Sequence, residues 1–263
     1  MTHGEDYLLD NSKPQAAQRF DVFATLFDPW TFAHLDRLGV QPGWRCWEVG
    51  AGGPSVPSWL AERAHPGGHV IATDIDVSLL RGSDSSFEVR LHDVRVDDPP
   101  MTTFDLVHAR LVLVHLAQRA AALRSMVASL QPGGWLLIED ADPALQPLAC
   151  PDEYGAEQQL ANKVRHGFRS LLAARGADLA YGRKLPRLLR EAGLVDVGAD
   201  AFFPVASAAG ARLERATVEQ LREQLVASEA VTSDELDAHV GNVSAGRIDV
   251  TTAPLISAWG RRP

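Results

Sequence analysis

Residues 44–54 read Trp-Arg-Cys-Trp-Glu-Val-Gly-Ala-Gly-Gly-Pro, and this stretch decides the fold. Its first six residues, 44–49, form a short apolar run that is typical of a buried strand. The run passes directly into glycines, and residues 55–64 behind them are predicted to form a helix. Glycines at a strand-to-helix turn let a ligand approach the backbone closely. The stretch therefore predicts a ligand-binding loop at the end of a buried strand.

The chain beyond this loop alternates between predicted strands and helices. Further strands are expected over residues 69–73, 87–91, 104–109 and 135–139, with a helix over 121–130. Alternation at this spacing predicts an α/β protein with a parallel sheet that is covered by helices on both faces.

After residue 142 the alternation breaks, and longer helical patterns take its place. The expected elements are helices over 152–174 and 185–192, a sixth strand over 194–205, a polar helical stretch over 213–240 and a closing strand over 251–259.

We expect one domain over residues 1–263, since we find neither internal repeats nor a separating linker. Before the first strand, helices over 14–27 and 29–38 are expected to form a cap. The expected parts are a helical cap (1–40), a cofactor-binding core (41–142), a helical lid insertion (143–192) and C-terminal strands and helices (193–263).

Composition narrows the range of partners. The net charge is -9 and the pI is about 5.4, which disfavours nucleic acid because such binding depends on Lys and Arg at phosphates. We expect neither a membrane span nor a signal peptide, and hence a cytoplasmic protein. The two cysteines, Cys46 and Cys150, are too few and too far apart for a disulfide framework.

Two kinds of ligand compete for the glycine loop. A dinucleotide site needs a third glycine where this chain has Ser55. Glu48 would also bring a carboxylate near a pyrophosphate, and Pro54 lacks an N–H group at the helix start. S-adenosylmethionine tolerates all three features, because it has no phosphate and carries an ammonium and a sulfonium group.

Acidic residues follow the next two strands. Asp74 comes 22 positions after Gly52, where an acidic side chain is expected to bind both ribose hydroxyls. Asp76 is interpreted as a helix cap rather than a ligand residue. Asp93 could accept the adenine amino group, and a turn residue is the alternative interpretation.

At this point the sequence resembles the class I S-adenosylmethionine-dependent methyltransferases, most closely the small-molecule enzymes common in bacteria. The resemblance rests on Glu-x-Gly-x-Gly at 48–52, the acidic residues at 74 and 93, residues 104–107 (Phe-Asp-Leu-Val) and residues 132–134 (Pro-Gly-Gly). It implies a Rossmann-like, doubly wound sheet of seven strands with the last strand antiparallel. It also implies S-adenosylmethionine as cofactor and S-adenosylhomocysteine as product.

Residue roles follow from the resemblance. It implies that Glu48, Gly50 and Gly52 hold the methionine part, Asp74 the ribose and Asp93 the adenine. One departure is that Gly53-Pro54 stands where many members have a third glycine. The complete set of expected cofactor-binding residues is Glu48, Gly50, Ala51, Gly52, Asp74, Ile75, Asp93, Val94 and Arg110.

Candidates for chemistry follow the fourth and fifth strands. Arg110 faces either the cofactor or an acidic partner. His115 could act as general base, although packing against the sheet is the favoured interpretation, and His108 is interpreted as structural. Asp140 could be a base or orient the substrate, with helix capping as the alternative. No metal site is expected. The expected catalytic residues are therefore His115 and Asp140, and the expected substrate residues are Tyr7, Trp30, Asp142 and Phe168.

These features predict methyl transfer from S-adenosylmethionine to a small organic molecule, at a hydroxyl oxygen. Methylation at nitrogen or carbon, methylation of RNA or protein, an NAD(P)-dependent oxidoreductase and a non-catalytic nucleoside-binding module are the alternatives. We expect a small-molecule substrate, no nucleic acid and no membrane partner, and leave a homodimer open.

Overall fold

The computed structural model describes residues 14–80, 86–100 and 103–263. The chain divides into two compact units. The first, called the sheet unit here, consists of Phe27–Ala141, Tyr181–Ala201 and Leu255–Pro263. The second, called the helical unit, contains Asp142–Ala180, Phe202–Pro254 and the chain up to Leu26. The expectation that both form one domain stays a prediction.

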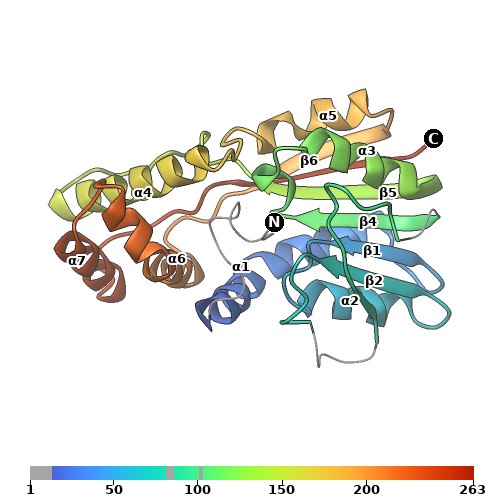
Figure 1. The fold of residues 1–263 in the computed structure, drawn as a ribbon, viewed down its shortest axis with the longest axis horizontal. Coiled ribbons are helices and arrows are strands. Elements are labelled where there is room, and N and C mark those ends of the chain that lie inside the picture. The colour runs from blue at the N-terminus through green and yellow to red at the C-terminus, as the bar shows by residue number, and fades with distance from the viewer. Residues whose placement is uncertain (1–13, 81–85, 101–102) are drawn as a thin grey trace. The chain divides into compact units, whose positions relative to one another are not determined.

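The sheet unit is built on seven strands in the order β3-β2-β1-β4-β5-β7-β6 (Figure 1). Strands β1 to β5 pair in parallel, and β7 runs antiparallel to β5. This confirms the predicted sheet with its antiparallel last strand. The strands are β1 (Arg45–Val49), β2 (His69–Asp74), β3 (Glu88–Leu91), β4 (Phe104–Arg110), β5 (Leu130–Ala141), β6 (Val195–Phe202) and β7 (Leu255–Arg261).

Helices cover both faces of this sheet. Those of the sheet unit are the second part of α1 (Pro14–Leu38), α2 (Ser55–Ala64), α3 (Arg119–Ser129) and α5 (Leu185–Glu191), with 3-10 turns η1 (Leu113–His115) and η2 (Gly182–Lys184). Leucines and alanines of α3 and α5 share one buried cluster with the sheet, while α2 and Leu35 of α1 share the other. Burial of these apolar faces provides the main driving force for the layered arrangement.

Alternation along the strands assigns neighbouring residues to opposite faces. Trp47 belongs to the cluster with α3, and Cys46 belongs to the cluster with α2. Glu48 therefore faces the same side as Cys46, the side covered by α1 and α2. The same rule separates Glu139 from Asp140 at the end of β5.

The structure corrects the prediction of two helices in the cap. A single helix, α1, runs through Pro29. A proline removes the hydrogen bond to the carbonyl four residues earlier, here Thr25. Both Thr25 and Pro29 are exposed, so water can satisfy that carbonyl and the helix can continue.

Two strand boundaries also differ from the prediction. Strand β5 begins at Leu130, because the glycine-containing stretch 131–134 is taken into the strand where its register with β4 shifts. Strand β7 begins at Leu255, and Thr251 instead forms an isolated bridge with Val205.

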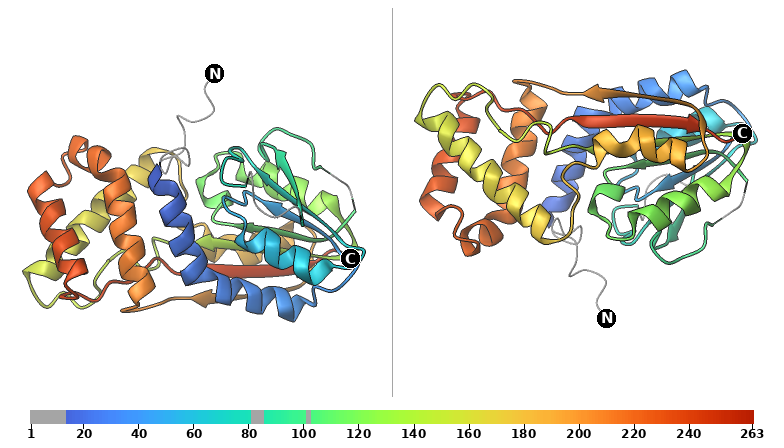
Figure 2. Two further views of the ribbon diagram at one scale, coloured as in Figure 1. Left: turned by 90° about the horizontal axis from the view of Figure 1, so that it is seen from below. Right: turned by 90° about the horizontal axis from the view of Figure 1, so that it is seen from above.

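The helical unit contains three helices that pack on one another (Figure 2). They are α4 (Ala156–Ala174), α6 (Ala208–Ala227) and α7 (Ser233–Ser244). Their shared core contains Val164 and Leu172 of α4, Leu221 and Leu225 of α6 and Leu236 of α7.

A buried chain of charges crosses this helical unit. Arg165 Nη2 lies 2.7 Å from Glu214 Oε2, and His239 Nε2 lies 3.1 Å from Glu214 Oε1. Arg165 also donates to the backbone oxygen of Thr251 at 2.9 Å. Burial alone would raise the pKa of Glu214, but Arg165 and His239 outweigh it and lower that pKa to about 2.

Helix α7 begins with a complete capping box, which gives a testable effect. Thr232 accepts the backbone N–H of Glu235, whose side chain accepts the N–H of Thr232. Changing Thr232→Ala should lower the free energy of unfolding by about 1 kcal/mol, because one backbone donor loses its acceptor. Thermal unfolding followed by circular dichroism measures this loss. The control is Thr25→Ala, since Thr25 is exposed inside α1 and its hydroxyl donates to the Asp21 backbone oxygen of the same helix. Equal losses in the two variants would contradict the capping role.

Within the described part of the chain, no helix has both the length and the apolar character needed to cross a membrane.

Candidate functional site

The glycine loop after β1 has an unusual backbone that glycine makes possible. Gly50 and Gly52 have φ values of 64° and 62°. A Cβ atom on Gly50 would lie 2.5 Å from Val112 Cγ2, closer than atoms can approach. The loop is held to β2 by the bond from Ala51 N to the Thr73 oxygen at 3.0 Å. Position 50 therefore requires glycine both for its φ and for the space it leaves.

Asp74, at the end of β2, organises this loop. Its Oδ2 accepts the N–H of Gly52 at 2.9 Å, and its Oδ1 accepts the N–H of Asp76 at 3.0 Å. Burial raises the pKa of Asp74, although the backbone N–H groups of Asp76, Gly52 and Ile75 act to lower it. The two carboxylate oxygens together have about four acceptor positions, and the three backbone donors leave one of them for a ligand hydroxyl. Ile75 beside it is 43% exposed.

Asp76 and Asp93 both take part in turns. Asp76 accepts the N–H of Ser78, and the described residues 78–80 form a turn. Asp93 pairs with the guanidinium of Arg95 through both of its oxygens, at 2.9 and 2.7 Å. Val94 between Asp93 and Arg95 is buried.

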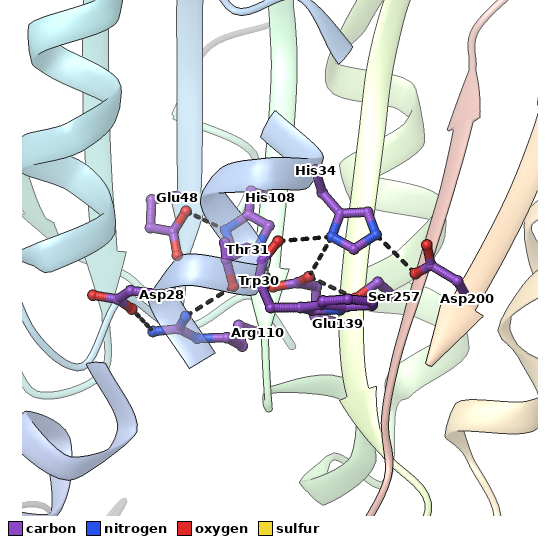
Figure 3. A network of polar contacts seen from close by, with 10 residues as sticks. All are labelled: Asp28, Trp30, Thr31, His34, Glu48, His108, Arg110, Glu139, Asp200 and Ser257. Atoms are coloured by element: carbon purple, nitrogen blue, oxygen red, sulfur yellow. Dashed lines mark hydrogen bonds and ion pairs between the residues drawn. The ribbon is translucent and has the colours of Figure 1, made fainter. Parts of the chain in front are cut away.

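A row of charged side chains crosses the sheet at the carboxyl ends of β1, β4 and β5 (Figure 3). Glu48 Oε2 lies 2.6 Å from His108 Nδ1, and Glu139 Oε2 lies 3.4 Å from His108 Nε2. All three side chains are almost fully buried. We call Glu48, His108 and Glu139 the Glu-His-Glu row. From the sequence, His108 is expected to be structural, and Glu139 is not predicted as a site residue.

The side chains of the Glu-His-Glu row stay charged although they are buried, because each lies next to a group of opposite charge. Burial would lower the pKa of His108, but Glu48 and Glu139 outweigh it and raise that pKa to about 9. Burial would likewise raise the pKa of Glu139, but His108, Arg110 and Ser257 bring it down to about 2. At neutral pH His108 is therefore a buried cation between carboxylates.

Polar side chains of α1 and β7 complete the surroundings of Glu139. Thr31 donates to Glu139 Oε2, and Ser257 donates to Glu139 Oε1 at 2.6 Å. Trp30 Nε1 in turn donates to Ser257 Oγ at 3.0 Å. His34 lies 2.9 Å from the Trp30 carbonyl and 2.8 Å from a carboxylate oxygen of Asp200. One face of the second part of α1 is thus tied to the sheet through polar contacts (Figure 3).

Arg110 connects the end of β4 to the same helix. Its Nη1 donates to Thr31 Oγ1 at 2.9 Å, and its Nη2 lies 2.9 Å from Asp28 Oδ1. The expected partnership with an acidic residue is present, and a role at the cofactor stays a prediction.

The candidate catalytic residues lie on β5 and on the turn after β4. His115 ends the turn η1 that follows β4, and it is partly exposed. Asp140 is fully buried, and its Oδ2 accepts the N–H of Val114 at 3.3 Å.

The expected substrate residues fall in different parts of the chain. Asp142 is buried in the helical unit, where it accepts the N–H of Leu145 at 2.9 Å, so it holds a turn. Phe168 packs against the core of the same unit. Trp30 belongs to the sheet unit, and Tyr7 lies outside the described residues. Substrate binding by these four residues stays a prediction.

Across residues 14–80, 86–100 and 103–263, no three His, Cys, Asp or Glu side chains are grouped so that they could hold a metal ion.

Comparison with known proteins finds similar methyltransferases. Residues 47–136 match the methyltransferase domain family. The chain is 25% identical over 173 residues to phosphoethanolamine N-methyltransferase 1 of Arabidopsis thaliana, which covers 63% of this chain and 32% of that protein. It is 31% identical over 150 residues to a ubiquinone/menaquinone biosynthesis C-methyltransferase of Bordetella parapertussis, covering 51% of this chain and 56% of the relative. The chain thus spans between about a third and a little over half of these relatives.

Solved structures share the fold. Phosphoethanolamine N-methyltransferase 2 of Haemonchus contortus, in complex with S-adenosylhomocysteine, matches 98% of this chain and 60% of its own, at 15% identity and a TM-score of 0.59. A putative methyltransferase in complex with the Haloferax volcanii Trm112 activator matches all of both chains, at 16% identity and a TM-score of 0.56. The fold is that of the class I S-adenosylmethionine-dependent methyltransferases. The match to the methyltransferase domain family covers residues 47–136 of this chain, which contain the glycine loop, the end of β1 and strands β2 to β4.

Proposed function

We propose that this protein transfers a methyl group from S-adenosylmethionine to a hydroxyl oxygen of a small organic molecule. The observation that carries the proposal is the glycine loop after β1, held in a left-handed backbone conformation against the carboxylate of Asp74. The loop and the carboxylate lie at the carboxyl ends of parallel strands, where open α/β sheets bind their ligands.

The start of α2 supports a ligand without phosphate. Pro54 is the N-cap residue of α2, and Pro57 lies in its first turn. Neither has a backbone N–H, so the helix start lacks two of the donors that a pyrophosphate would use. Glu48, immediately before the loop, adds a carboxylate. These features favour a cationic nucleoside over NAD(P).

The residues present fit S-adenosylmethionine. The remaining acceptor position of Asp74 suits a ribose hydroxyl, the exposed side chain of Ile75 suits a base, and the glycine loop leaves room for the methionine part. When bound, this cofactor supplies an electrophilic methyl group. The protein then needs to align the acceptor and to remove its proton. His115 is the side chain that we assign to proton removal, since it is partly exposed at the end of the turn after β4.

An amine acceptor is the second candidate. Two of the similar proteins are named phosphoethanolamine N-methyltransferases. Incubation with S-adenosylmethionine and panels of small phenols, alcohols and amines separates these cases. Methylated amines without methylated hydroxyls would contradict the choice of oxygen.

The cofactor is tested by calorimetric titration. S-adenosylhomocysteine should bind the wild-type protein, and NADH should not. Asp74→Asn should weaken S-adenosylhomocysteine by about a hundredfold, because an amide replaces one of two charge-assisted acceptors. Asp76→Asn is the matched control, since Asn keeps the oxygen that accepts the Ser78 N–H, and it should stay within about threefold of wild type.

Two results would overturn the proposal. NADH binding without a response to S-adenosylhomocysteine would restore the oxidoreductase interpretation. Tight binding of S-adenosylhomocysteine with no turnover over the whole panel would favour a non-catalytic nucleoside-binding module.

A further inference from the structure

The turn that follows β4 has a strained start. Leu111 has a φ of 57°, which non-glycine residues rarely adopt. Its N–H donates to the backbone oxygen of Glu139 at 2.8 Å. The chain then enters η1, residues Leu113–His115, where the N–H of His115 bonds to the Val112 oxygen at 3.1 Å. Backbone strain of this kind persists only when the surroundings impose it, and it is often found at functional sites.

One side of the turn packs against the glycine loop. The Val112 side chain occupies the space in which a Cβ of Gly50 would lie, with Cγ2 only 2.5 Å from that position. A displacement of Val112 would therefore change the packing against Gly50 in the loop that we assign to the cofactor.

Asp140 holds the other side of the turn. Its Oδ2 accepts the N–H of Val114 at 3.3 Å, and the N–H of Leu113 also bonds to this carboxyl group. These are the first N–H groups of η1, which have no partner within the turn itself. The residue on β5 thus supplies, from a distant part of the sequence, the acceptor that the turn lacks.

The side chain of Asp140 is shielded from solvent. The residue is 0% exposed, and its Oδ1 has no hydrogen-bond partner among the described residues. Burial raises the pKa of Asp140 well above its usual range, although the backbone bonds from Val114 and Leu113 act in the opposite direction. A carboxyl group that is buried in this way reaches backbone donors rather than solvent.

We infer that Asp140 is a positioning residue of the methyl-transfer site, which fixes the turn 111–115 and with it both Val112 at the glycine loop and His115. This inference rests on the proposed function, and it replaces the role of base or substrate contact that the sequence suggested for Asp140. In this role the carboxyl group binds the backbone of the turn and makes no contact with cofactor or substrate. It acts through the turn.

The test compares Asp140→Ala with Asp140→Asn in the full chain. Alanine removes the acceptor, whereas the amide oxygen of asparagine can still accept from Leu113 and Val114. We expect hydrogen exchange of the Leu113 and Val114 amides to accelerate at least tenfold in Asp140→Ala. S-adenosylhomocysteine should bind about tenfold more weakly to this variant, and the imidazole NMR titration of His115 should shift. In Asp140→Asn, the two amide exchange rates and the affinity for S-adenosylhomocysteine should lie within about threefold of the wild-type values. The His115 titration should match that of the wild type.

Asp105→Ala is the matched control. Asp105 Oδ2 also accepts a backbone N–H in this sheet, that of Arg45 at 2.7 Å, but it lies at the amino end of β4. This variant should leave S-adenosylhomocysteine affinity and the exchange at Leu113 and Val114 unchanged.

Two results would overturn the inference. One is unchanged exchange and affinity in Asp140→Ala. The other is an Asp140→Asn variant as impaired as Asp140→Ala, which would assign the effect to the acidic group itself. Failure of the wild-type protein to bind S-adenosylhomocysteine would instead overturn the proposed function, while amide exchange still reports whether Asp140 holds the turn.

Discussion

Replacing His108 with leucine should lower the free energy of unfolding by about 3–5 kcal/mol. The substitution fills a similar volume, but it removes the only cation of the Glu-His-Glu row among the three side chains that form it. Glu48 and Glu139 are 2% and 0% exposed, so water cannot replace the lost partner. Breaking one side of a buried ion pair is costly because the remaining charge stays desolvated. Urea unfolding of the wild type and the variant at pH 7 measures the difference.

His69→Leu is the matched control for this prediction. His69 also pairs with a glutamate, Glu88, at 2.9 Å, but the two side chains are 45% and 38% exposed. Its loss should cost less than about 1 kcal/mol, as is usual for surface pairs. A cost below 1 kcal/mol for His108→Leu as well would show that the row contributes no more than a surface pair.

The same row predicts how stability depends on pH. The pKa of His108 is raised from 6.5 to about 9, so its stabilisation is complete below pH 6.5 and is lost as the pH rises through about 9. The pKa of Glu139 is lowered from 4.5 to about 2, so its contribution is present above pH 4.5 and is lost as the pH falls through about 2. The alkaline loss should disappear in His108→Leu, and an unchanged alkaline slope would contradict the assignment.

Changing Gly50→Ala should weaken S-adenosylhomocysteine binding by at least a hundredfold. The new Cβ would lie 2.5 Å from Val112 Cγ2, and the φ of 64° disfavours any side chain. Either the loop or the turn after β4 must move, and both border the site that we assign to the cofactor. Calorimetric titration with S-adenosylhomocysteine measures the loss.

Gly39→Ala separates the steric effect from the backbone effect. Gly39 has a φ of 86°, but a Cβ there would meet nothing within 4 Å. This control should lose roughly 1–2 kcal/mol of stability and leave cofactor affinity unchanged. Removing the methyl groups of Val112 in the double variant Gly50→Ala/Val112→Ala should recover part of the affinity. If Gly50→Ala binds as the wild type does, the close approach at Val112 has no role in the site.

Most of the fold follows from local patterns in the sequence. The apolar runs at 44–49 and 104–109 are long enough for buried strands, and helix α2 occupies the predicted residues 55–64. The predicted ends of helices and strands were wrong where solvent exposure or strand register determines them. Pro29 does not end α1 because its side of the helix is exposed, and β5 starts before its glycines because the pairing with β4 tolerates a shift.

The site was only partly accessible from the sequence. Asp74 and the glycine loop could be predicted because they lie within 27 residues of one strand-loop-helix-strand segment, 48–74. The Glu-His-Glu row could not be predicted, because its residues lie on three strands. Glu48 is 60 residues from His108 along the chain, and His108 is 31 residues from Glu139. The one available signal was a histidine and a glutamate within otherwise apolar strands, at His108 and Glu139. Buried polar residues of this kind need partners, but spacing along the chain does not identify them.

Glu139 and Asp140 limit where residues can be inserted into or deleted from strand β5 during evolution. The first residue joins the sheet to α1, and the second holds the turn after β4, on the opposite face. An inserted or deleted residue just upstream would turn both side chains to the wrong faces at once. The stretch 131–134, where the register with β4 is already irregular, can absorb such a change before it reaches them. Variation in chain length is therefore compatible with this site at the beginning of β5, and incompatible with it at the end.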